Sequence, residues 1–115
     1  MTILTSIIQG LLAALFLMAG AGKTVGLQMH KENFDKWRLP QWFRVVTGIV
    51  ELVGAVLLII GFWSISSGIA GALLLGVTAI GGILTHVRVK DSMKDTATII
   101  VLGVLAFALL FLLLQ

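Results

Sequence analysis

Four long apolar runs constrain this chain more than any other feature. They cover residues 3–22, 45–63, 65–85 and 96–114, and each is close to the length of a membrane span. The hydrocarbon core of a bilayer is about 30 Å thick, which takes roughly 20 helical residues to cross. Lipid offers the backbone no hydrogen-bond partners, and runs this long exclude the short alternating strands of a membrane barrel. The sequence therefore predicts an all-α fold, an integral membrane four-helix bundle.

The composition agrees with a membrane protein of one domain. Only 11% of the residues are charged, against about a quarter in soluble domains, so too few polar groups remain to cover a water-facing surface. We expect residues 1–115 to form a single membrane domain whose main partner is the lipid bilayer. The chain has no cysteine, which excludes disulfide exchange, thiolate metal sites and iron–sulfur ligation. No metal site is expected.

The positive charges predict an orientation. All eight lysines and arginines lie in two connections between the runs, residues 23–44 and 86–95. Positively charged loops stay in the cytoplasm, so we expect a multi-pass protein of the cell (plasma) membrane with these two loops cytoplasmic and both termini outside. The same charges would contact anionic lipid headgroups, and no nucleic-acid partner is expected. Residues 19–21 of the first run resemble the cleavage site of a signal peptide, but no positive side chain precedes the run and it is longer than the usual apolar region of about 7–15 residues, so we expect it to remain as a span.

The connection between the first two runs has a pattern of its own. From His30 to Arg38 it mixes Phe34 and Trp37 with charged residues, which is typical of a short helix lying at the membrane interface. Pro40 should stop this helix, because proline cannot continue a helical hydrogen-bond ladder.

Glu51 is the one acidic residue inside an apolar run. A carboxylate in lipid is costly, so it should face a partner or a wet cavity, which makes Glu51 a functional-site candidate. Helical spacing places Glu51 on one face with Arg44, Thr47, Gly48 and Gly54. Because small residues let another helix approach closely, we expect this face to look into the bundle.

The predicted topology brings four ionisable groups to the cytoplasmic half of the membrane. Lys23 ends the first run, Arg44 and Glu51 belong to the second, and His86 ends the third. We predict one inner-leaflet cluster centred on Glu51, with Lys23 and Arg44 as its counter-charges. Three interpretations stay open: a structural ion pair that fixes helix packing, a ligand or proton site, and a lipid-headgroup site. Catalytic and cofactor-binding residues are not assigned.

Small residues recur at intervals of four. Gly68, Ala72 and Gly76 follow this spacing in the third run, and Gly10 and Ala14 in the first. Such ridges predict close helix–helix contacts, within the bundle or between copies of the chain, so self-association is allowed.

Several short motifs match a known family. Gly22-Lys23 ends the first run, Leu39-Pro40 precedes the second, Gly48 and Glu51 form a Gly-x-x-Glu, and Gly61-Phe62 follows at the next turn. With these marks, and with His86 near the end of the third run, the chain resembles the DoxX-like family of small bacterial and archaeal membrane proteins. The resemblance covers most of the chain and implies a four-helix bundle in the bacterial inner membrane.

The resemblance also implies a class of function. Some relatives are membrane subunits of thiosulfate–quinone oxidoreductases, and others associate with oxidative-stress systems. By this resemblance we expect an accessory subunit of a membrane redox system, without catalysis of its own, with a redox-protein partner and a polar pocket around Glu51. No electron-carrying cofactor site is evident, and quinone is the candidate ligand near Glu51 and His86. Two alternatives stay open: a small proton-coupled transporter, and a structural assembly module without chemistry.

Overall fold

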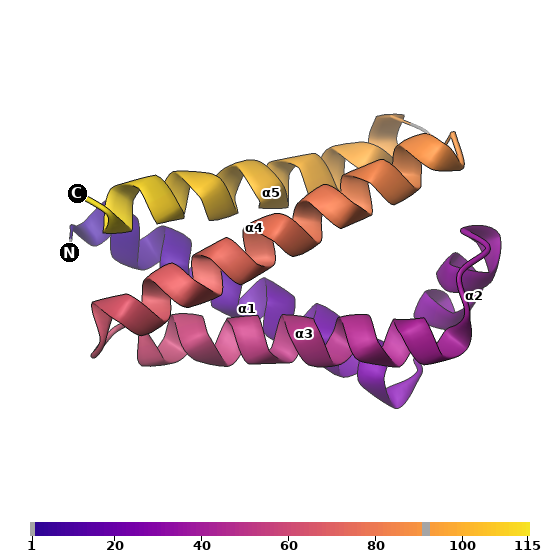
Figure 1. Cartoon of the computed structure of the whole chain (residues 1–115), viewed down its shortest axis with the longest axis horizontal. Helices are drawn as coiled ribbons and strands as arrows, with labels where there is room; N and C mark the ends of the chain where they lie inside the picture. Colours follow the sequence, from indigo (N-terminus) through magenta and orange to yellow (C-terminus); the bar gives the residue numbers. More distant parts are fainter. Residues whose placement is uncertain (1, 91–92) are drawn as a thin grey trace.

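The computed structural model describes residues 2–90 and 93–115, with the side chains of 93–95 excepted, and this part of the chain forms five helices. They are α1 (Ile3–Val25), α2 (Gln28–Lys36), α3 (Gln41–Ile60), α4 (Ile65–Arg88) and α5 (Met93–Leu113). All except α2 contain a segment long and apolar enough to cross a membrane. The prediction of an all-helical membrane bundle with a short helix between the first two spans is confirmed (Figure 1).

The helix ends differ from the predicted spans by a few residues. The helix of the second run begins directly after Pro40 and ends at Ile60, earlier than the expected Trp63. The helix of the third run continues through His86 to Arg88, so part of the predicted 86–95 loop is helical. The rest of that prediction falls largely outside the described residues, including the side chain of Lys94.

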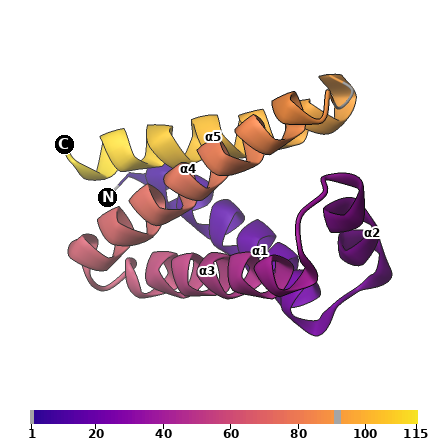
Figure 2. The same ribbon diagram turned by 45° about the vertical axis from the view of Figure 1, so that its right-hand side comes forward.

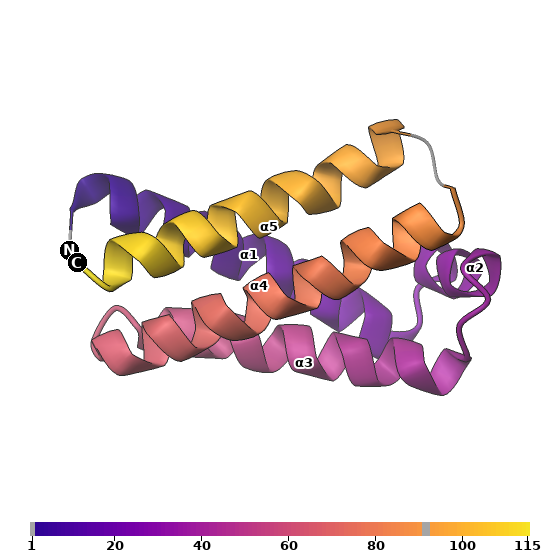
Figure 3. The same ribbon diagram turned by 45° about the horizontal axis from the view of Figure 1, so that its top comes forward.

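The long helices form two packed pairs. α1 packs against α3, α5 packs against α4, and α3 joins the two pairs through its contact with α4. Both chain termini lie at one end of the bundle, which we call the termini end (Figure 3). The opposite end carries α2 and the last turn of α4, and we call it the basic end. From the turn that joins them at the termini end, α3 and α4 diverge toward the basic end (Figures 1 and 2).

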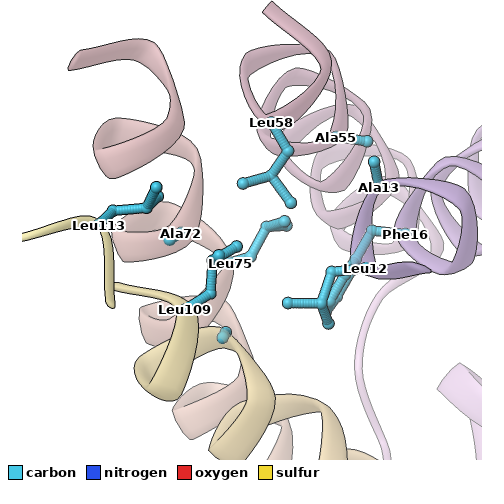
Figure 4. Close-up of a cluster of buried hydrophobic side chains, with 10 residues drawn as sticks. Leu12, Ala13, Phe16, Ala55, Leu58, Ala72, Leu75, Leu109 and Leu113 are labelled. Carbon is cyan, nitrogen blue, oxygen red and sulfur yellow. The ribbon is translucent and has the colours of Figure 1, made fainter. Parts of the chain in front are cut away.

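A compact apolar core holds the four long helices together. Leu12 and Phe16 from α1, Leu58 from α3, Leu75 from α4 and Leu109 from α5 are almost completely buried and meet in it (Figure 4). Many other large apolar side chains point outward and remain exposed. In lipid such side chains are already in an apolar solvent, so close van der Waals packing, more than apolar burial, stabilises the bundle.

A buried glutamine fastens the end of α3. Gln9 of α1 is fully buried, and its Nε2 donates a 2.7 Å hydrogen bond to the carbonyl oxygen of Leu58. In a continuing helix this carbonyl would accept from the amide of Phe62, but that amide donates to Ile59 instead. Gln9 therefore caps one of the carbonyls that a helix end leaves without an intrahelical partner. The position of Gln9 also explains why α3 can end at Ile60.

Candidate functional site

Glu51 forms a buried ion pair with Lys23. The Nζ of Lys23 lies 2.8 Å from Oε1 of Glu51, and the two side chains are only 13% and 6% exposed. Lys23 lies in the last turn of α1, and Glu51 lies on the face of α3 that also buries Arg44, Gly48 and Gly54. This face looks into the bundle, as the spacing predicted, and Lys23 has the predicted place as a counter-charge of Glu51.

Two glycines bring the pair together. A Cβ atom at Gly48 would lie 2.9 Å from the carbonyl oxygen of Gly20, and one at Gly20 would lie 2.8 Å from that of Gly48. The backbones of α1 and α3 therefore cross at these two residues with no room for a side chain. Lys23 and Glu51 each follow a crossing glycine by three residues, which is nearly one helical turn. The crossing thus sets the separation of the two charges.

The expectation that Arg44 is a second counter-charge of Glu51 is wrong. The guanidinium of Arg44 donates to the carbonyl oxygen of Lys23 through Nη1, and to Oε1 of Gln41 at 2.7 Å through Nε. Arg44 lies two helical turns before Glu51, and its guanidinium meets the carbonyl at the C-terminal end of α1 first. A cation is favoured at that position by the helix dipole. Arg44 consequently holds the end of α1 against α3, and among the described residues Lys23 is the ion-pair partner of Glu51.

A cavity of about 430 Å³ lies at the basic end, where α3 and α4 diverge. The pair Lys23–Glu51 and the ring of His86 border it, and most of the remaining lining is apolar. The other lining residues are Phe34, Trp37, Leu39, Phe43, Val46, Thr47, Val50, Thr78, Gly81, Gly82, Thr85 and Ile99. Three of the four predicted cluster residues therefore share one cavity, whereas Arg44 is outside its lining.

The short helix α2 closes one side of this cavity. Phe34 is only 2% exposed and packs against Trp37, with 5.2 Å between ring centroids, and against Phe43. Trp37 in turn meets the imidazole of His86 edge-on at 5.0 Å, and its carbonyl oxygen accepts a hydrogen bond from Arg88. The sequence predicted that Phe34 and Trp37 would mark the membrane interface, but in the structure both line the cavity.

His30, which the sequence placed only in the interfacial helix, is a neighbour of the site. Its ring packs over Gly22, where an added Cβ would come within 3.0 Å of it. Burial, together with the positive charges of Lys23 and Arg44, lowers the pKa of His30 below its usual value. The only sequence signal was the place of His30 in α2, and nothing in the spacing indicated that α2 would fold back over the end of α1.

Comparisons with known proteins agree with the motifs. The family model described as the DoxX-like family matches residues 7–109. The chain belongs to the DoxX-like family. This DoxX-like protein is also 32% identical over 89 residues to YdgD of Bacillus subtilis (strain 168), described as uncharacterized, and the match covers 76% of this chain and 78% of YdgD. No solved structure matches the chain.

The chemistry available in this DoxX-like site is narrow. Within the described residues, no three His, Cys, Asp or Glu side chains gather closely enough to hold a metal ion. The cavity instead offers an ammonium, a carboxylate and an imidazole against aromatic and aliphatic walls. Such a set can hydrogen-bond a polar ring substituent or exchange a proton with it, while the walls bind an apolar body.

Proposed function

We propose that this multi-pass membrane protein is an accessory subunit of a membrane redox system, and that its cavity binds the headgroup of a quinone. One observation carries the proposal: Lys23, Glu51 and His86 border a single, mostly apolar cavity. Its volume of about 430 Å³ falls in the range of small-molecule sites, roughly 300–1,000 Å³.

Access from the bilayer supports a lipid-soluble ligand. Phe43 and Val46 both line the cavity and are 39% and 44% exposed on the outer surface of α3. An apolar molecule dissolved in the membrane would therefore meet the rim of the cavity without crossing water. The ring carbonyls of a quinone would then accept hydrogen bonds from the ammonium of Lys23 or the imidazole of His86.

Reduction of a quinone to a quinol consumes protons together with electrons. The carboxylate of Glu51 and the imidazole of His86 are groups that exchange protons. The chain has no cysteine for iron–sulfur or disulfide chemistry, so the electrons would come from a redox-protein partner. By the positive-inside rule the basic end would face the cytoplasm, and protons would be taken up, and the partner bound, on that side.

Trp37 provides a direct binding assay because its ring lines the cavity. In a Trp42→Phe, Trp63→Phe background it is the only tryptophan. We expect decylubiquinone to quench its fluorescence saturably in lipid nanodiscs. A variant with Trp63 as the only tryptophan reports quenching by quinone merely dissolved in the bilayer, since Trp63 lies at the termini end and is 83% exposed.

A cavity-filling variant makes the assay specific. Gly81 lines the cavity, and a Cβ there would have no heavy atom within 4 Å, so we expect Gly81→Phe to place its ring at the cavity with little cost to helix packing. Val77, one turn earlier and 55% exposed, supplies the matched control Val77→Phe on the lipid face. Saturable quenching should disappear in Gly81→Phe and persist in Val77→Phe. Equal, non-saturable quenching of Trp37 and Trp63, or no effect of Gly81→Phe, would refute a quinone site.

A further inference from the structure

A second cavity at the basic end is lined almost entirely by cations. It has a volume of about 370 Å³ and is bordered by Lys36, Arg38, Arg88, Val89 and Lys90. Four of these five residues are basic, and no acidic side chain lines the cavity within the described residues. None of these residues lines the cavity proposed to bind quinone.

The two cavities are lined by neighbouring residues of the same two segments. Trp37 and His86 line the first cavity, and their near neighbours Arg38 and Arg88 line the second. The hydrogen bond from Arg88 to the carbonyl oxygen of Trp37 joins α4 to the end of α2. One cation of the second cavity is thus held in place by the fold before any ligand arrives.

The backbone brings two further cations into the cavity at unusual positions. Arg38 and Lys90 have φ angles of 60° and 57°, in the left-handed region. Arg38 follows the end of α2, where its amide donates to Asp35, and Lys90 follows the end of α4, where its amide donates to Val87. Glycine or asparagine normally occupies such a position. Here both positions carry long basic side chains that converge on one cavity.

We propose that this cavity binds a phosphoryl group that carries more than one negative charge. The positive charges of Arg38, Arg88 and Lys90 repel one another across this concavity when it is empty, and a multiply charged anion relieves that repulsion. Arginine guanidinium groups match the oxygens of a phosphate geometrically, and lysine adds point charges. The phosphate can come from the headgroup of an acidic lipid or from a soluble compound, and the chemistry of recognition is the same.

Phosphatidic acid and pyrophosphate distinguish the two sources. Apparent Kd values are measured for the full chain by native mass spectrometry, with phosphatidic acid, phosphatidylglycerol or pyrophosphate as the probe and phosphatidylcholine as background. We expect a phosphomonoester or pyrophosphate to bind more tightly than phosphatidylglycerol, whose phosphodiester carries one charge. Tight binding of phosphatidic acid alone identifies a lipid source, and tight binding of pyrophosphate identifies a soluble one.

Asparagine variants remove the charge without straining the backbone. Arg38→Asn and Lys90→Asn each delete one cation at a position whose left-handed conformation asparagine tolerates. Each should weaken binding about fivefold, which corresponds to about 1 kcal/mol per basic residue near a charged lipid surface. The control Lys31→Asn removes the same charge from an exposed residue of α2 outside the cavity and should leave the Kd unchanged. Equal losses in all three variants, or no preference over phosphatidylglycerol, would overturn the proposal.

Discussion

The ion pair between Lys23 and Glu51 allows a quantitative test of how the α1–α3 contact is stabilised. At their 2.8 Å separation, two unit charges attract by about 6 kcal/mol at an effective dielectric constant of about 20. Much of this attraction offsets the cost of removing both groups from water. The more informative quantity is the loss on deleting one partner, because the other charge then stays buried alone, at a cost of about 3–5 kcal/mol.

We expect Lys23→Met to lower the free energy of unfolding by about 3 kcal/mol, because it strands the carboxylate of Glu51. Glu51→Gln should cost less, about 1–2 kcal/mol, since the flexible lysine can extend its ammonium toward the basic end. The double variant should be more stable than Lys23→Met alone, with a coupling of about 2 kcal/mol.

Equilibrium unfolding in mixed micelles, titrated with dodecyl sulfate and followed by circular dichroism, measures these differences. Lys31→Met is the matched control, because the same substitution falls on an exposed lysine of α2. A loss below about 0.5 kcal/mol for Lys23→Met, the scale of ordinary surface substitutions, or strictly additive effects in the double variant, would refute the reasoning.

Three further outcomes follow from the fold. Gly48→Ala should lower the free energy of unfolding by about 1–3 kcal/mol through overpacking, because its Cβ would lie 2.7–2.9 Å from atoms of α1. Gly81→Ala, with open space around its Cβ, should leave the stability unchanged. Equal effects of the two variants would contradict the close crossing of α1 and α3 at Gly48. Gln9→Leu should cost about 1–3 kcal/mol by leaving the carbonyl of Leu58 uncapped, and an unchanged midpoint would exclude that cap. Because the pKa of His30 is lowered in the folded chain, the unfolded chain binds a proton at this residue first as the pH falls. The free energy of unfolding should therefore decrease as the pH drops below about 6.5. His30→Asn should reduce this dependence of stability on pH, and an unchanged dependence would contradict the lowered pKa.

The helices and the inward face of α3 were predictable because their signals are local. Run length, together with the absence of backbone partners in lipid, determines the spans, and helical spacing determines that Glu51 shares a face with Gly48. The pairing with Lys23 followed from topology, because both residues had to lie at one end of the bundle.

Contacts that depend on how helices rotate against each other were not predictable. On α1 the interval of Gly10 and Ala14 suggested a contact ridge, but Ala14 is exposed and the buried face carries Gln9, Leu12 and Phe16 instead. Both faces have helical spacing, and only the fit to α3 selects between them. The partner of Arg44 and the fold of α2 over the cavity likewise depend on tertiary geometry that spacing does not encode.

The divergence of α3 from α4 bears on whether a ligand could pass through the bundle. The cavity lies at the basic end, and the layer of packed core leucines, with Leu58, Leu75 and Leu109 among them, does not contribute to its lining. A molecule bound at Glu51 would therefore lie in a cavity whose described lining includes no residue of the termini end. For the chain to act as an exporter, that leucine layer would have to separate. The described arrangement accordingly favours a docking chamber over a conduit.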